Sequence, residues 1–178
     1  AQESASGRVV TINVVHFAQD GTRLAHETER FAIRGRSYSS ALPKPAAQYG
    51  AAADLHGYDV DATPRRMLRR VVVSAPKDMT AFARTSGDFN PIHTSYRGAA
   101  ISGLKAPLVH GMWLSAAAQH VAQALDEKGA RYELIGWTYN MYGMVQLNDK
   151  VEITVERVGK VRRAGLALEV TCRVNGQV

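Results

Sequence analysis

Residues 110–128 read HGMWLSAAAQHVAQALDEK and decide the fold. Almost no charge precedes Asp126, and apolar side chains recur at the spacing of a helix, at Met112, Ala116, Ala117, Val121 and Leu125. The pattern predicts a helix over residues 110–128 that protein covers on most sides. A helix of this kind must bury its apolar surface against other elements of the fold.

Strand patterns flank the expected helix on both sides. Before it, residues 67–74 contain a run of three valines, which is typical of a strand buried on both faces. After it, strands are expected at residues 132–145, 150–158 and 162–174. Turn residues separate these strands, and Val151, Ile153 and Val155 alternate strictly with polar residues. We therefore expect an α+β fold in which an antiparallel sheet curls around one long central helix.

Two short helical segments are expected before the long helix. Pro76 suits a first helical turn because its φ angle is fixed, and apolar residues follow it at helical spacing. We expect this helix to end at Gly87. A second short helical stretch is expected at residues 95–101.

The first third of the chain has a different character. Residues 8–34 alternate apolar and polar around a central Asp-Gly pair, which predicts a β-hairpin. A hairpin alone is only marginally stable, so we expect residues 1–36 to pack either on the rest of this chain or on a domain that precedes it. Residues 37–66 contain three prolines and no sustained periodicity, so we expect a linker there and the main domain at 67–178.

Composition restricts the class of protein. The chain has 178 residues, 46% of them hydrophobic, which is enough for a packed domain. Its 22 Lys and Arg against 16 Asp and Glu give a formal charge of +6, in scattered pairs with no nucleic-acid-reading pattern. Cys172 is the only cysteine, which excludes an internal disulfide and a cysteine-based zinc site. With no membrane span or signal peptide in the sequence, we expect a cytoplasmic protein with neither nucleic-acid nor membrane partners.

The segment Gly87-Asp88-Phe89-Asn90-Pro91-Ile92-His93 carries the clearest chemistry. Asp88 and His93 lie five positions apart, and we expect Pro91 to prevent a regular helix and bend the backbone so that both side chains face one pocket. A carboxylate and an imidazole can together remove a proton from carbon and protonate a departing hydroxyl. The alternative is ordinary turn and capping chemistry, for which Asn90 is well suited as an Asx-turn residue.

His110 and Gly111 begin the long helix. The first amide of a helix is a preorganised donor with the positive end of the helix dipole behind it. Gly111 has no side chain, so a substrate can approach its amide closely, and we predict that this N–H holds an oxygen that gains charge. We expect His110 to shape the entrance. Capping or packing is the alternative for His110, and close packing alone is the alternative for Gly111.

Two blocks of sequence together resemble a known family. Residues 86–93 and residues 107–112, which read SGDFNPIH and PLVHGM, are similar in order and distance to the signature of the MaoC-like, (R)-specific enoyl-thioester hydratases. Residues 142–145 and the Asn148-Asp149 pair resemble more narrowly the dehydratase domain in the β-type portion of fungal and actinobacterial type I fatty acid synthases. The resemblance covers residues 67–178 and implies a hot-dog fold, with the N-terminal hairpin as the end of a preceding hot-dog unit. Because no initiator methionine is present, we expect an excised piece of a multienzyme.

The resemblance also implies an activity and a set of site residues. The reaction would be reversible dehydration of (3R)-hydroxyacyl thioesters to trans-2-enoyl thioesters in fatty acid biosynthesis. Asp88 and His93 would be the catalytic dyad, the Gly111 amide would hold the thioester oxygen, and Asn90 and His110 would contact the substrate. No metal or redox cofactor is expected, because the substrate arrives on the phosphopantetheine of acyl carrier protein or CoA. The expected protein partner is a second hot-dog unit or another domain of a fatty acid synthase.

Some alternatives stay open at the level of sequence. Gln119 stands where some family members have a serine that supports the aspartate, which leaves the acyl-length preference open. A stand-alone (R)-specific enoyl-CoA hydratase would carry the same motifs. A non-catalytic hot-dog unit that braces a multienzyme would be expected to lose either Asp88 or His93, whereas this chain keeps both.

Overall fold

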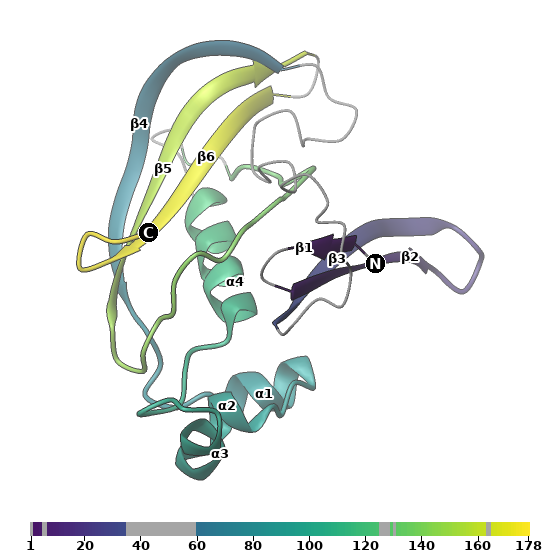
Figure 1. The fold of residues 1–178 in the computed structure, drawn as a ribbon. Coiled ribbons are helices and arrows are strands. Elements are labelled where there is room, and N and C mark those ends of the chain that lie inside the picture. The colour runs from purple at the N-terminus through teal and green to yellow at the C-terminus, as the bar shows by residue number, and fades with distance from the viewer. Residues whose placement is uncertain (1, 5–6, 35–59, 125–128, 130, 163–164) are drawn as a thin grey trace. The chain divides into compact units, whose positions relative to one another are not determined.

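A computed structural model describes residues 2–4, 7–34, 60–124, 129, 131–162 and 165–178. The chain divides into two compact units, residues 1–49 and residues 50–178. The first unit holds one small sheet, and the second holds a larger sheet with all of the helices described (Figure 1).

The N-terminal unit is a three-stranded antiparallel sheet of order β1-β2-β3. Its strands are β1 (Gln2–Ser4), β2 (Gly7–Phe17) and β3 (Arg23–Arg34). The β2-β3 turn is closed by Asp20, whose Oδ1 accepts from the Thr22 amide at 2.9 Å, and by Gly21, whose φ is +83°. The expected hairpin is confirmed, and β1 adds a short strand that the sequence did not indicate. The assignment of this hairpin to a preceding hot-dog unit stays a prediction.

The second unit contains an antiparallel sheet of order β4-β5-β6, and Figure 1 shows this sheet strongly curled. Its strands are β4 (Val60–Ser74), β5 (Lys150–Val161) and β6 (Gly165–Val174). Strands were expected at 150–158 and 162–174, and β5 and β6 confirm both. We expected the first strand at residue 67 after a linker, but β4 begins at Val60. Residues 37–59 of that expected linker lie outside the described residues.

The early part of β4 was missed because it contains an irregular step. The ladder with β5 shifts register between Ala62 and Arg66, and Pro64 lies inside this irregularity. A proline is tolerated at such a point because it has no N–H to offer the ladder. The guanidinium of Arg65 bridges Glu156 on β5 and Glu169 on β6, at 3.1 Å and 2.7 Å. Proline therefore marks a bulge here and not a linker.

The helices lie between β4 and β5 in sequence. They are α1 (Thr80–Ser86), α2 (Pro91–Thr94), α3 (Tyr96–Ile101) and α4 (Gly111–Ala122). We expected the first helix to begin at Pro76, but it begins at Thr80, whose amide is capped by the Asp78 carboxylate at 2.9 Å. It ends as expected at Gly87, with φ +76°. None of the helices in the described part of the chain is long and apolar enough to cross a bilayer.

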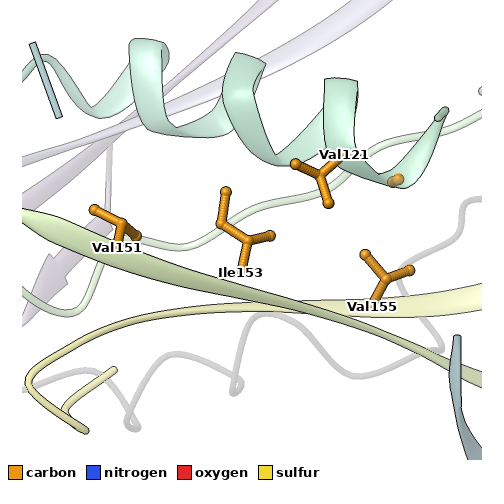
Figure 2. Close-up of a cluster of buried hydrophobic side chains, with 5 residues drawn as sticks. Val121, Val151, Ile153 and Val155 are labelled. Atoms are coloured by element: carbon orange, nitrogen blue, oxygen red, sulfur yellow. The ribbon is translucent and has the colours of Figure 1, made fainter. Parts of the chain in front are cut away.

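The core of this unit lies between α4 and β5. Figure 2 shows Val121 of α4 directed toward Val151, Ile153 and Val155, which alternate along one face of β5. Val151 and Ile153 are fully buried, and each such side chain contributes about 1.5–3 kcal/mol by leaving water. The expected sheet around a central helix is therefore confirmed. The helix is shorter than expected, because it ends at Ala122 and residues 125–128 lie outside the described part.

The expected strand at residues 132–145 is wrong. This segment is irregular, and an isolated bridge between Leu108 and Gln146 directly follows it. It is held to α4 by side chains instead, since the indole of Trp137 donates to Ser115 Oγ at 2.9 Å. We call residues 131–149 the α4-side segment. Trp137 and Val145 of this segment pack against the core cluster, whereas Ile135, Tyr142 and Met144 are exposed.

Candidate active site

The end of α1 places Asp88 in a tight turn. Gly87 leaves the helix in the left-handed conformation, and the Ser86 hydroxyl accepts from the Asp88 amide at 3.3 Å. The Asp88 carboxylate in turn accepts from the Asn90 amide at 3.0 Å, which closes an Asx-turn. One half of the Asp88 side chain stays exposed. The carboxylate is therefore held in direction by the backbone while it remains accessible to a ligand.

Asn90 and Pro91 build the next turn. Asn90 is the N-cap of α2, and its side chain accepts from the Ile92 amide at 3.3 Å. Its interpretation as an Asx-turn residue is confirmed, while its contact with substrate stays a prediction. Pro91 is the first residue of α2, so it begins a helix where we expected it to prevent one. The short helix carries His93 back toward the Asp88 turn.

The imidazole of His93 is fixed by a backbone carbonyl. Its Nδ1 lies 2.9 Å from the carbonyl oxygen of Leu108. A carbonyl only accepts, so Nδ1 carries the proton of the neutral ring and Nε2 has a free lone pair. Partial burial lowers the pKa of His93 below its ordinary value of 6.5, and His110 lowers it further, while the Leu108 carbonyl and Asp88 act in the opposite direction. His93 is thus a neutral base near pH 7.

His110 lies between the two expected catalytic residues. Its side chain is only 2% exposed. The Nε2 atom is 3.0 Å from the carbonyl oxygen of Asp88 and 3.5 Å from the carboxylate Oδ2 of the same residue. The ring stacks on His93, with centroids 3.9 Å apart and planes inclined by 27°. The three residues that were singled out in two separate motifs therefore form one cluster.

Gly111 is the first residue of α4, directly after this cluster. The amides of a first helical turn have no partner within the helix, so the Gly111 N–H is oriented to donate outward. A Cβ at this position would collide with the terminal Sδ and Cε atoms of Met141. Close packing is therefore one reason for a glycine here. Its role as a donor to substrate stays a prediction.

A cavity of about 1120 Å³ opens beside the cluster. Asp88, His93, His110 and Gly111 are among its lining residues. Its walls come from α4, the α4-side segment, β5 and β6, and they include Ser115, Trp137, Leu168, Val170, Cys172 and Val174. Cys172 is partly buried, and burial raises the pKa of its thiol. The cavity therefore joins the acid–base groups to apolar side chains of β6, while Glu169 and Arg173 of the same strand add charged groups to the wall.

The ring geometry fits acid–base chemistry. Donor atoms of Asp88, His93 and His110 lie within 4.8 Å of one another, which is close enough for a shared cation. A backbone carbonyl engages one nitrogen of each ring, which leaves the other nitrogen with a lone pair that can accept a proton. The expectation of no metal stays a prediction.

Several cavity residues were not predicted from the sequence. Ser115 is buried and lines the cavity, whereas Gln119, where a supporting serine had been considered, is absent from its lining. Trp137 was expected to pack in a sheet but binds Ser115. Met141 covers Gly111. The only signal for these residues was the helical spacing of Ser115 from Gly111, four positions along one face.

A family model described as a MaoC like domain matches residues 52–176, which is most of the chain. The chain belongs to the MaoC-like domain family. This membership confirms the family resemblance of the two motif blocks. It also accounts for the hot-dog arrangement of a curled sheet and a central helix.

Individual MaoC-like relatives differ in size and origin. The chain is 40% identical over 91 residues to the fatty acid synthase beta subunit TOXC of Cochliobolus carbonum, an overlap of 51% of this chain and 4% of that protein. It is 32% identical over 128 residues to the 3-hydroxybutyryl-CoA dehydratase of Methylorubrum extorquens, an overlap of 70% and 78%. The chain thus spans a small part of the synthase subunit and most of the dehydratase.

A solved structure supports the MaoC-like fold. The full-length peroxisomal multifunctional enzyme type 2 from Drosophila melanogaster aligns with a TM-score of 0.55 at 19% identity. The alignment covers 98% of this chain and 32% of that chain. At this identity the likeness concerns the fold alone.

Proposed function

We propose that this chain catalyses the reversible dehydration of (3R)-hydroxyacyl thioesters to trans-2-enoyl thioesters, as a hydro-lyase of fatty acid biosynthesis. The observation that carries the proposal is the pair Asp88 and His93, whose donor atoms lie within 4.8 Å of each other and which both line the cavity. The lone pair of His93 Nε2 is free because Leu108 holds the other nitrogen. Family membership adds to this argument.

His93 is the proposed base. In dehydration, its Nε2 removes the proton from the carbon next to the thioester carbonyl, and the C–H electrons pass toward the carbonyl oxygen. A base with a pKa below the ordinary histidine value stays unprotonated near neutral pH. We therefore expect the acid limb of the pH profile of kcat/KM to be centred below pH 6.5, which is the ordinary pKa of a histidine. A limb centred above that value would contradict His93 as the base.

Asp88 is the proposed acid. In its protonated form it gives a proton to the departing hydroxyl, which leaves as water while the carbon–carbon double bond forms. The reaction leaves one proton on His93 and an ionised Asp88, and transfer between these neighbouring groups restores the starting state. In hydration, the Asp88 carboxylate takes a proton from the attacking water, and protonated His93 gives its proton to the carbon next to the thioester carbonyl. The half-exposed carboxylate is open to the water that either direction needs.

The Gly111 amide is the proposed donor to the thioester oxygen. The oxygen gains negative charge as the α-proton leaves, and a fixed N–H at the positive end of α4 stabilises that charge without reorganisation. Met141 lies over Gly111, and its flexible end has to move when a thioester binds there. Donation by the Gly111 amide thus requires the Met141 side chain to change its conformation.

The remainder of the cavity is proposed to hold the acyl chain. Its wall of Leu168, Val170 and Val174 is apolar, as an alkyl chain requires. The thioester would arrive on the phosphopantetheine of acyl carrier protein or CoA, and no further cofactor takes part. Relatives named as fatty acid synthase beta subunits favour the carrier-bound form, and the relative named as a 3-hydroxybutyryl-CoA dehydratase favours a CoA thioester as the alternative.

A protein partner is also proposed. Large apolar side chains are exposed on the α4-side segment and the start of α4, at Met112, Ile135, Met141, Tyr142 and Met144. A group of exposed apolar residues of this size is typical of an interaction surface. A second hot-dog unit or another domain of a fatty acid synthase is the proposed occupant.

The test is hydration of crotonyl-CoA, followed by loss of its conjugated absorbance. Asp88→Asn and His93→Ala are each expected to lower kcat by about 10²–10⁴-fold while the fold stays intact. Asp78→Asn is the matched control for Asp88, because Asp78 makes the same kind of turn to an amide two residues on, outside the cavity. His120→Ala, on the exposed side of α4, is the control for His93.

The outcomes separate the candidate functions. Loss in both site variants with both controls active supports the dyad, and equal activity in all variants contradicts it. A lower KM for crotonyl-pantetheine on carrier protein than for crotonyl-CoA supports the biosynthetic role, and the reverse supports a stand-alone enoyl-CoA hydratase. No turnover of any thioester, with or without a partner unit, indicates a bracing unit.

A further inference from the structure

His110 is buried more deeply than a residue that only shapes an entrance. It is the N-cap of α4, yet its side chain makes no capping hydrogen bond. Polar side chains buried to this extent are normally paired. Its pairing is with the Asp88 turn and with His93, which are the groups proposed to carry the chemistry.

The bond to Asp88 has a defined direction. The Asp88 carbonyl only accepts, so His110 Nε2 carries the proton and donates to it across 3.0 Å. The other ring nitrogen, Nδ1, is buried and has no hydrogen-bond partner within the described part of the chain. A buried nitrogen without a partner is unfavourable. His110 has one such nitrogen, while its other nitrogen directs an N–H at the backbone of Asp88.

The ring of His110 also contacts two other rings. It stacks on His93, and Phe82 of α1 lies against it with ring centroids 5.2 Å apart and planes inclined by 55°. His93 is itself tied to the carbonyl of Leu108, two residues before His110. One short segment, residues 108–110, therefore holds the base through a carbonyl and the acid through an imidazole N–H.

We infer that His110 is a positioning residue, whose Nε2–H fixes the backbone of Asp88 and whose ring fixes the plane of His93. The inference rests on the proposed function, since it assigns His110 a task toward that acid and that base. It differs from a contact with substrate, because it acts through Asp88 and His93. Small displacements of catalytic groups cost large factors in rate, so the effect belongs in kcat.

Two variants separate the N–H from the ring. His110→Gln keeps a side-chain N–H that can reach the Asp88 carbonyl and removes the ring, whereas His110→Phe keeps a ring and removes the N–H. We expect His110→Phe to lower kcat about 100-fold and His110→Gln to stay within about tenfold of the parent. KM is expected to change less than about threefold in both, because the lost interaction concerns the transition state.

The kinetic outcomes decide the role of the N–H. A kcat of His110→Phe equal to that of the parent overturns the inference, and so does an equal loss in the two variants. A change confined to KM also overturns it, because that result would indicate that His110 contacts the substrate directly. Thermal midpoints of both variants are measured alongside, so that a loss of fold is recognised.

A second measurement does not depend on the reaction. Nitrogen-15 spectra of the full chain report which imidazole nitrogen of His110 carries the proton, and Nε2–H is expected. Exchange of the Asn90 amide, which donates to Asp88, is expected to be at least about tenfold faster in His110→Phe than in His110→Gln. An Nδ1–H tautomer in the parent, or equal exchange in both variants, overturns the inference.

The two measurements keep the two proposals distinguishable. A parent chain without activity toward any thioester contradicts the proposed function. The tautomer and the Asn90 exchange then still decide whether His110 fixes the Asp88 turn. Because the tautomer is read from the parent chain, it gives a result even when a variant does not fold.

Discussion

Strand β5 and the α4-side segment both pack on α4 and were both expected to be strands, but only β5 is a strand. β5 is hydrogen-bonded to β4 on one side and β6 on the other. The α4-side segment is attached at separate points, by Trp137 to Ser115 and by the Val109 amide to the Val145 carbonyl. The apolar residues of a segment indicate that one side of it is buried. They do not indicate whether other strands lie along its edges, which is what makes a segment a strand.

The same difference assigns the two regions different tasks. The β5 side forms the core beneath α4 and gives stability. The α4-side segment lines the cavity and covers Gly111, so its residues touch the space where a substrate is proposed to bind. Substitutions on the two sides of α4 should therefore separate stability from substrate binding.

Ile153→Ala should have the largest effect on stability. The side chain is fully buried at the centre of the β5 core, and the cavity left behind should lower the free energy of unfolding by about 2–5 kcal/mol. Urea unfolding followed by circular dichroism measures the loss. Val72→Ala is the control, since Val72 is 62% exposed on the neighbouring strand and should change stability by less than about 0.5 kcal/mol. Equal losses would contradict the assignment of the core to this face of β5.

Gly98→Ala should have the second largest effect. A Cβ on Gly98 would meet the backbone oxygen of Pro91 at 2.8 Å and its carbonyl carbon at 2.9 Å, neither of which can rotate away. We expect a loss of about 1–3 kcal/mol. In Gly111→Ala, by contrast, the clashing atoms are the flexible end of Met141, so the loss should be clearly smaller. A larger loss for Gly111→Ala in the same unfolding assay would show that Met141 is fixed.

Trp137→Phe should have a smaller effect on stability. It removes the indole N–H that donates to the buried Ser115 hydroxyl and keeps an aromatic ring against α4, so we expect a loss of about 1 kcal/mol. Ser115→Ala removes the other partner. If the two changes act through this one bond, the double variant should lose no more than the larger single loss. Additive losses, measured by urea unfolding, would mean that the bond is not what attaches the α4-side segment.

Met141→Ala should leave stability almost unchanged. The side chain is 55% exposed, so the free energy of unfolding should change by less than about 0.5 kcal/mol. Because its flexible end lies over Gly111, its removal should lower the KM for crotonyl-CoA by about threefold, since no side chain then has to be displaced. Steady-state kinetics check this. An unchanged KM would mean that the substrate does not approach Gly111 from the side of Met141.

The sequence predicted those features that depend on local patterns. The hairpin, β5, β6 and the central helix follow from period and turn residues, which report the side that each segment buries. The closeness of Asp88 and His93 also follows from one short turn. Their role in catalysis remains a prediction that rests on this closeness and on family membership.

Features that depend on distant residues were not predictable in the same way. The beginning of β4 was hidden because Pro64 is acceptable only when β5 and the Arg65 bridges accommodate a bulge. A strand was predicted at residues 132–145, within the α4-side segment, because the residues of this segment do not indicate that a helix lies beside it instead of another strand. The burial of His110 between Phe82 and His93 needs three segments brought together by the fold.

The thiol of Cys172 can report on the state of the cavity. The chain has no other thiol, so alkylation by iodoacetamide measures the accessibility of one position on the cavity wall. Burial keeps little of this thiol ionised near neutral pH, so the labelling should be slow and should speed up when the thiol becomes exposed on unfolding. An occupant of the cavity would shield the sulfur. The rate of labelling would then measure the occupancy of the cavity without any turnover.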